Sequence, residues 1–164
     1  MTIKEIINSH TYTVDHWLLH RLEEEFNKGT YSKRENVDAL ALELTLKKEG
    51  KIVTLDKLPN ESYQWRHDWA YTDEILIDLK RRPNWSSNYS LSGVHKMLDS
   101  YNKGQLTHIV GFSQNIETKY KIGDVLNFTF EGILPVKEAI QKSKNKCSFN
   151  LLSKFCLHEE EFVV

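Results

Sequence analysis

Residues 71–80, YTDEILIDLK, restrict the possible folds more than any other part of the chain. The polar triplet at 72–74 predicts a turn, and the apolar run at 75–77 predicts a buried strand after it. The preceding segment, YQWRHDWAY at 63–71, is expected to form the other arm of a hairpin. The chain should therefore contain a sheet, with this apolar strand inside it.

The rest of the chain alternates between helix-like and strand-like segments. Apolar residues at helical spacing predict helices, and short β-rich runs predict strands. Helices are expected at 13–28, 90–103 and 136–143, and strands at 51–58, 107–112, 125–134 and 147–157. In the helix at 90–103, the expected inward stripe is Leu91, Val94, Leu98 and Tyr101. This order predicts an α/β fold, with a mixed central sheet flanked by helices.

Residues 35–48, ENVDALALELTLKK, fit two structures. Val37, Leu40, Ala41 and Leu44 form a helical stripe, and the composition favours a helix that stops before Gly50. The leucines at 40, 42, 44 and 46 also alternate as they would in a strand. The helix is the preferred prediction because its start and stop residues agree.

Length and composition indicate an ordinary globular protein. A chain of 164 residues with 40% apolar residues can bury one substantial core, so a single domain is expected. No run reaches the roughly 18–20 apolar residues of a membrane span, and the first residues lack signal-peptide features. A cytoplasmic location is therefore expected. The two cysteines, Cys147 and Cys156, are expected to be reduced and buried.

The formal net charge of −1 hides two basic segments, 80–103 and 137–154, each with a net charge of +4. Clustered Lys and Arg can neutralise phosphates of a nucleic acid. A solvated lysine-rich surface would have the same composition, so charge alone leaves both interpretations open.

Asp68, Asp78 and Lys80 are the candidate catalytic residues. Side chains two apart on a strand share a face, so Asp78 and Lys80 should point the same way. The turn at 72–74 should fold Asp68 back beside them. Two converging carboxylates provide the hard oxygen ligands that Mg²⁺ prefers. A metal and a lysine ammonium can together activate water and neutralise charge during phosphodiester hydrolysis.

These residues resemble the motif of the PD-(D/E)XK phosphodiesterases, which include restriction enzymes and archaeal Holliday-junction resolvases. That family has an acid at the start of a hairpin and, after an apolar strand, Asp or Glu, any residue and Lys. Here the pattern reads His67-Asp68, ILI and then Asp78-Leu79-Lys80. His67 replaces the usual proline, and Asp78 replaces the more common Glu, which shortens the reach to a metal by one methylene.

The resemblance covers residues 35–115 and implies a restriction-endonuclease-like core there. Residues 1–34 would form an N-terminal helical extension, and 116–164 C-terminal strands with a basic segment. The family's metal ligands, transferred to this chain, would be Asp68, Asp78 and the backbone carbonyl of Leu79, with Mg²⁺ or Mn²⁺ as cofactor. Lys80 would be catalytic.

A further acidic ligand is implied from the family's first helix. Glu35 is the preferred candidate, with Asp38 and Glu43 as rivals.

The expected function is a metal-dependent nuclease whose partner is nucleic acid, with DNA favoured over RNA because the resembling family mostly cuts DNA. A homodimer would suit cleavage of two strands. The expected nucleic-acid-binding residues are Arg81, Arg82, Trp85, Lys96 and Lys103. His16 and His20 have the spacing of a zinc pair but are expected to face solvent, and His95 is expected to pack.

Two alternatives remain. The chain could be a non-catalytic module that binds nucleic acid or protein through the same fold, or Lys80 could simply form a salt bridge with an aspartate at a strand end.

Overall fold

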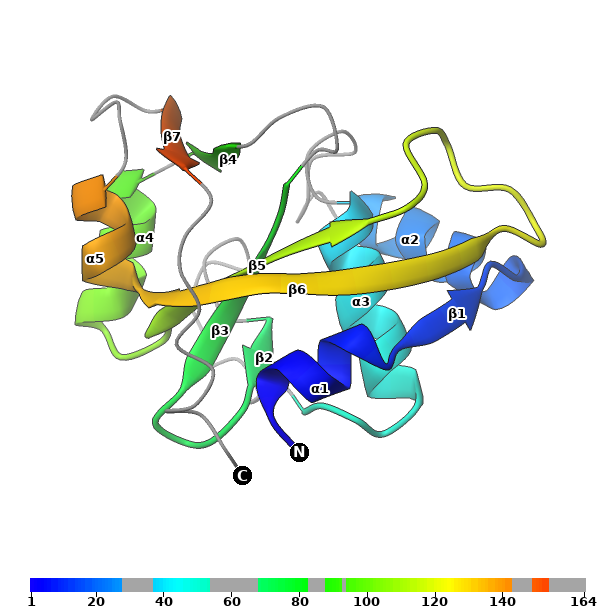
Figure 1. Ribbon diagram of the computed structural model, residues 1–164, viewed down its shortest axis with the longest axis horizontal. Helices are drawn as coiled ribbons and strands as arrows, with labels where there is room; N and C mark the ends of the chain where they lie inside the picture. The colour runs from blue at the N-terminus through cyan, green and yellow to red at the C-terminus, as the bar shows by residue number, and fades with distance from the viewer. Residues whose placement is uncertain (28–36, 54–67, 83–87, 93, 143–148, 154–164) are drawn as a thin grey trace.

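The computed structural model describes residues 1–27, 37–53, 68–82, 88–92, 94–142 and 149–153 (Figure 1). Five helices and seven strands lie in these ranges. The helices are α1 (Ile3–Asn8), α2 (His16–Asn27), α3 (Val37–Lys48), α4 (Val94–Asn102) and α5 (Val136–Lys142). The strands are β1 (Thr11–Thr13), β2 (Trp69–Ala70), β3 (Leu76–Arg81), β4 (Asn88–Ser92), β5 (His108–Gln114), β6 (Val125–Pro135) and β7 (Phe149–Ser153).

Five strands form one mixed, strongly curled sheet in the order β1-β6-β5-β3-β2. Strands β3 and β5 are parallel, whereas the other neighbours in this sheet are antiparallel. Parallel neighbours need a crossover connection, and here the chain between β3 and β5 contains α4. Strands β4 and β7 pair with each other in a separate two-stranded ribbon. The predicted α/β class with a mixed sheet is therefore confirmed.

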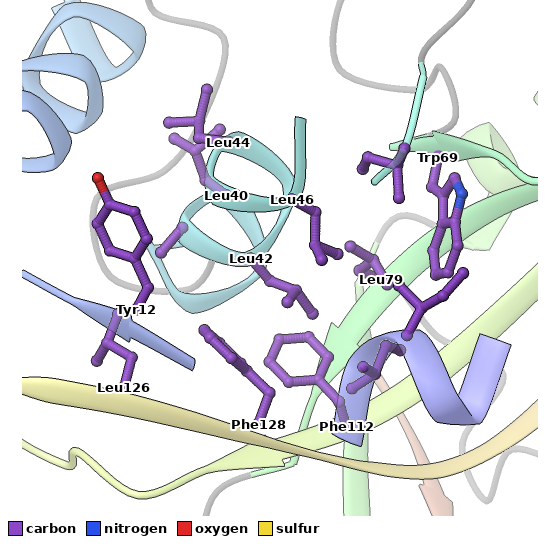
Figure 2. Close-up of a cluster of buried hydrophobic side chains, with 14 of the residues drawn as sticks. Tyr12, Leu40, Leu42, Leu44, Leu46, Trp69, Leu79, Phe112, Leu126 and Phe128 are labelled. Atoms are coloured by element: carbon purple, nitrogen blue, oxygen red, sulfur yellow. The ribbon is translucent and has the colours of Figure 1, made fainter. Parts of the chain in front are cut away.

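The larger core lies between the sheet and helices α1, α2 and α3. Every residue of α3 from Leu40 to Leu46 is buried, so the helix has apolar neighbours on more than one side. Figure 2 shows Leu42 and Leu46 pointing toward Phe112 and Leu79, whereas Leu40 and Leu44 lie on the other side of α3. The helix prediction for this ambiguous segment is therefore confirmed. The strand-like alternation of its leucines arises because they pack on two sides of one helix.

The smaller core lies on the opposite face of the sheet. Met97 of α4 and Ala139 of α5 pack there with Ile109 of β5, and Figure 1 shows α4 and α5 side by side at one end of the sheet. Asp78 is paired in register with Ile109, whereas its neighbour Leu79 is buried in the larger core. Because side chains alternate along a strand, Asp78 and Lys80 face the α4–α5 side.

The predicted helix at 90–103 needs correction at its beginning. Residues 88–92 form β4, and α4 starts only at Val94. The expected inward stripe is also wrong at Leu98, which is 37% exposed, while Met97 is fully buried. The end is as expected, since Gly104 follows the helix at a positive φ of 74°.

The other predicted elements agree with the structure to different extents. The helix at 13–28 is α2, and the strands at 107–112 and 125–134 are β5 and β6. The helix at 136–143 corresponds to α5, and the last strand to β7. The strand expected at 51–58 is represented by an isolated bridge between Val53 and Ala70, because residues 54–67 lie outside the described ranges. The short elements α1 and β1 were not predicted.

None of the helices in the described ranges has the length and apolar character needed to span a bilayer.

Candidate functional site

The β2–β3 hairpin brings the two predicted aspartates together. Its turn is held by the Thr72 hydroxyl, which accepts hydrogen bonds from the backbone N–H groups of Glu74 and Ile75. Trp69 pairs with Ile77, and this pair ends the β2–β3 ladder. Asp68 comes just before β2, and its backbone N–H donates to the Ile77 carbonyl at 2.7 Å. The predicted hairpin is therefore confirmed, and it brings Asp68 close to Asp78, which follows Ile77.

The side chain of Asp68 lies against the outer edge of β3. Its Oδ2 accepts a hydrogen bond from the backbone N–H of Leu79 at 2.8 Å. Strand β2 is only two residues long, so it does not extend along β3 as far as Leu79. The carboxylate thus satisfies an N–H group at the strand edge, and this bond holds Asp68 beside the Asp78-Leu79-Lys80 segment.

The surroundings of Asp68 oppose its ionisation. The pKa of its carboxyl group is raised well above the ordinary value, first because surrounding protein removes water and then because Asp78 and Glu43 carry negative charge nearby. The hydrogen bond from Leu79 acts in the opposite direction but is the weakest of these influences. A carboxyl group whose pKa is shifted by burial and by neighbouring carboxylates is a common feature of acid–base and metal sites.

Lys80 lies on the same face of β3 as Asp78, as predicted. Its Nζ is 3.1 Å from Asp78 Oδ2, and the two side chains are only 19% and 18% exposed. The pair therefore sits in a partly dehydrated position, where the ammonium offsets the charge of one carboxylate. The arrangement has two neighbouring carboxylates, with one ammonium beside Asp78.

Among the rivals for the further acidic ligand, Glu43 is the one whose charge acts on Asp68. It is 3% exposed in the middle of α3. Asp38 is held elsewhere, because its carboxylate accepts hydrogen bonds from Gln114 and Tyr120 and pairs with Arg81. The preferred candidate, Glu35, lies outside the described residues.

The donors fit a hard divalent cation bound mainly through water. Within the described part of the chain, no three Asp, Glu, His or Cys side chains form a group that could enclose a metal ion. Mg²⁺ does not need such a cage, because it keeps several waters and commonly binds proteins through one or two carboxylates. Asp68 and Asp78 supply two, and Glu43 adds negative charge nearby.

Comparisons with family models, curated proteins and solved structures gave no match. The chemistry of the site is therefore inferred from the chain's own residues.

The two arginines after Lys80 are engaged by carboxylates inside the protein. Arg81 Nε lies 2.8 Å from Asp38 Oδ2, and the Arg81 side chain is 11% exposed. Arg82 forms two hydrogen bonds of 2.7 Å with Glu131. These contacts assign both side chains a structural role, and their predicted role in nucleic-acid binding gains no support from their placement.

The other predicted site residues lie partly outside the described residues. Lys103 is on the surface, 61% exposed, and forms an i,i+4 ion pair of 2.9 Å with Asp99. The backbone of Lys96 belongs to α4, but its side chain is not among those described, nor is that of His95. Trp85 lies outside the described ranges. Both cysteines also lie outside the described ranges. His16 and His20 are exposed, as expected.

Two buried polar groups were missed by the sequence reading. Glu131 accepts hydrogen bonds from Arg82 and, at 2.5 Å, from the hydroxyl of Tyr89. His10 is fully buried and its Nε2 lies 2.7 Å from Thr45 Oγ1. Their partners are distant in sequence, so no local pattern could have found either group.

Proposed function

We propose that this protein is a divalent-metal-dependent nuclease that hydrolyses phosphodiester bonds, with DNA as the favoured substrate. The observation that carries this proposal is the neighbouring pair Asp68 and Asp78, with the Lys80 ammonium 3.1 Å from Asp78 Oδ2. Burial first, and then the negative charge of nearby Asp78, raise the pKa of Asp68. A cation would turn the same arrangement into an attractive one.

Each residue would have a distinct task. Asp68 and Asp78 would hold Mg²⁺ or Mn²⁺, with the Leu79 carbonyl as the ligand that the family resemblance implies. A bound cation would lower the pKa of a coordinated water and polarise the phosphoryl group. Lys80 would orient the attacking water and neutralise charge that develops on the phosphoryl oxygens.

The order of elements supports assignment of the core to the restriction-endonuclease-like type. Helix α3 precedes the β2–β3 hairpin, β4 and α4 follow it, and β5 then pairs in parallel with β3. The resembling family has a helix and a strand before the motif hairpin and a helix and a core strand after it. The expected first strand, at 51–58, is represented by the bridge of Val53. The two-stranded β4–β7 ribbon and the N-terminal α1–β1 unit would be additions to that core.

A non-catalytic binding module is the second candidate. The ion pair between Lys80 and Asp78 favours it, because the lysine already neutralises one of the two aspartates without a metal. In such a protein the hairpin acids and the lysine would form a structural corner, and exposed lysines such as Lys103 would contact phosphates.

A cleavage assay separates the two candidates. The purified protein is incubated with single- and double-stranded DNA and with RNA, with Mg²⁺, with Mn²⁺ or with a chelator. The nuclease proposal expects cleavage that requires the cation and is lost in Asp78→Ala and in Lys80→Ala. Asp99→Ala and Lys121→Ala remove exposed charges elsewhere and should leave cleavage unchanged. Intact substrates under all conditions, or cleavage that survives both site substitutions, would reject the proposal.

A further inference from the structure

A polar cluster lies on the same face of β3 as Asp78 and Lys80. Arg82 comes directly after β3, and its backbone N–H donates to the Phe112 carbonyl of β5 at 2.7 Å, so the extended pairing continues there. Because side chains alternate, Arg82 points to the same face as Lys80. Arg82 Nε and Nη2 donate to the two carboxylate oxygens of Glu131 in β6, at 2.7 Å each. The ion pair therefore reaches across β5, the strand between β3 and β6.

A β-bulge in β6 directs Glu131 to this cluster. Gly111 of β5 pairs with Gly132, and the next residue, Phe112, pairs with Phe130, so Glu131 is the extra residue of the bulge. A bulge interrupts the ladder locally and can redirect a side chain. The Glu131 side chain is only 4% exposed. A carboxylate at such a buried position needs partners that hold its charge.

Tyr89 of β4 completes this outer cluster of Arg82, Glu131 and Tyr89, and it lies beside the position of Lys80. Its hydroxyl donates to Glu131 Oε1 at 2.5 Å, and the residue is fully buried. Gly111 is the β5 residue paired with Lys80, and a Cβ there would lie 2.6–2.8 Å from the hydroxyl oxygen and two ring carbons of Tyr89. The phenol thus occupies the space that a side chain at position 111 would fill.

This packing limits where the Lys80 side chain can lie. Neighbouring strands are about 4.8 Å apart, so the phenol of Tyr89 borders the Lys80 stem on the β5 side. Arg82 is the next residue along this face of β3 and carries the same charge as Lys80. The remaining direction leads to Asp78, whose Oδ2 is 3.1 Å from the Lys80 ammonium.

We propose that Tyr89, held in place by Glu131 and Arg82, is a positioning residue that confines the Lys80 ammonium to the side of Asp78. The inference rests on the proposed function, in which Lys80 is the catalytic cation. Tyr89 is fully buried, so it acts through Lys80 and does not touch a substrate. Burial first, and then the hydrogen bond to Glu131, raise the pKa of the Tyr89 hydroxyl, so it keeps its proton and remains a donor.

The opposite face of β3 offers a matched control. There Arg81 pairs with Asp38 of α3, and the buried Tyr120 donates a hydrogen bond from its hydroxyl to the same carboxylate. This inner cluster has the same three kinds of group as the outer one. Arg81 and Lys80 are adjacent in the strand, however, and point to opposite faces. Truncation of Tyr120 should therefore reduce stability without releasing Lys80.

The first measurement is the reactivity of the Lys80 amine, which needs no substrate. The metal-free protein is treated briefly with an acetylating reagent, and mass spectrometry gives the rate of acetylation at Lys80 in wild type, Tyr89→Leu and Tyr120→Leu. We expect Tyr89→Leu to raise this rate several-fold, because the side chain is no longer held at Asp78. Tyr120→Leu should leave the rate unchanged. Denaturant unfolding records the stability of each variant.

The second measurement is cleavage with Mn²⁺. Tyr89→Leu should lower kcat by about 10²-fold, the cost of a misplacement of about 1 Å, while KM and the Mn²⁺ dissociation constant stay at their wild-type values. Simple loss of folded protein would be shared by Tyr120→Leu. Tyr89→Phe keeps the ring and loses only the bond to Glu131, so it should change kcat and the Lys80 reactivity in the same directions but less. This variant maintains the test if Tyr89→Leu does not fold.

Three results would overturn the inference. The first is wild-type reactivity of Lys80 in both Tyr89→Leu and Tyr89→Phe, and the second is an equal rise of this reactivity in Tyr120→Leu. The third is a wild-type kcat despite a more reactive Lys80. A wild-type protein that cleaves nothing would instead reject the proposed function, and the acetylation rates would still decide whether Tyr89 confines Lys80.

Discussion

Asp68 lies close to Asp78 at the β2–β3 hairpin, and its Oδ2 accepts a hydrogen bond from the Leu79 N–H at 2.8 Å. A structural ion pair would require only one acid next to Lys80. Asp68 is a second acid, and burial first, and then the negative charge of Asp78, raise the pKa of its carboxyl group. This cost to stability is the physical reason for regarding the corner as a functional site, and it leads to the first prediction.

Replacing Asp68 by Asn should stabilise the metal-free protein and abolish cleavage. The amide oxygen can still accept the hydrogen bond from Leu79. Asn does not titrate, so it removes the free energy that folding spends on raising the pKa of Asp68 above its value in the unfolded chain. For a chain of this size, each kcal/mol of this cost that is removed should raise the unfolding midpoint by about 2–4 °C. Thermal unfolding with a chelator measures this shift. Asp99→Asn, at an exposed position, should show no such gain, and a destabilised Asp68→Asn would contradict this argument.

Cation binding should release a proton from Asp68. Because the folded-state pKa of Asp68 is raised, the metal-free protein retains a proton there at a pH where an ordinary aspartate is ionised. A cation must displace it, so affinity should rise with pH until the raised pKa is passed. Calorimetry with Mn²⁺ in two buffers of equal pH and different ionisation enthalpy measures the release. Equal heats in both buffers for wild type would contradict the prediction.

Lys80→Met should separate catalysis from metal binding. The substitution keeps much of the side-chain volume but removes the ammonium that lies 3.1 Å from Asp78 Oδ2. Mn²⁺ affinity should stay the same or increase, since one carboxylate oxygen loses a competing cation. The rate of cleavage should fall by about 10²–10³-fold, the usual cost of removing one group that stabilises developing charge. Retained cleavage at the wild-type rate would rule out a catalytic role for Lys80.

His10 should make the fold sensitive to acid. Its Nε2 lies 2.7 Å from Thr45 Oγ1, and its Nδ1 lies 3.3 Å from both the Lys51 ammonium and Glu49 Oε2. Burial first, and then Lys51, lower the pKa of His10 to about 4. As the pH falls below 6.5, His10 binds a proton in the unfolded chain but stays neutral in the folded chain until the pH approaches 4. The free energy of unfolding should therefore decrease progressively from pH 6.5 to 4.

Denaturant unfolding of wild type and His10→Gln at several pH values isolates this contribution. The difference in unfolding free energy between the two proteins should be largest above pH 6.5 and should shrink toward pH 4. Other acids titrate equally in both proteins and cancel. A difference that is constant with pH would show that His10 is not kept neutral in the folded state.

Gly111→Ala should destabilise the fold beside Lys80. Gly111 is the residue of β5 paired with Lys80, and a Cβ there would come within 2.6 Å of the Tyr89 hydroxyl. Tyr89 is fully buried and bound to Glu131, so its ring has little freedom to move away. The expected loss is about 1–3 kcal/mol, as for other overpacked cores. Urea unfolding measures it, and an unchanged midpoint would contradict the close packing of Tyr89 on this strand.

Sequence patterns predicted the elements whose signals are local. The hairpin followed from its turn triplet and apolar run, and α3 from its helix-favouring composition and from Gly50 after it. Helix α4 was placed too early because its apparent stripe included residues that β4 uses, and Leu98 proved to be exposed. Strand β4 pairs only with β7, some sixty residues later, so its signal is not local.

The candidate site was predictable to a similar extent. Asp68, Asp78 and Lys80 share one hairpin, and simple alternation predicted their relative placement. The choice among acids of the first helix required knowledge of how α3 lies on the sheet. One local feature did distinguish Glu43, since it is an isolated acid within a run of leucines, whereas Asp38 stands in the first turn, where acids commonly favour the helix dipole.

The most direct test of the metal site is a crystal of the protein grown or soaked with Mn²⁺ and measured at the manganese absorption edge. The account predicts an anomalous peak in contact with carboxylate oxygens of both Asp68 and Asp78. A structure in which Mn²⁺ binds elsewhere, or in which Lys80 and a protonated Asp68 keep the two carboxylates in place without any peak, would contradict it.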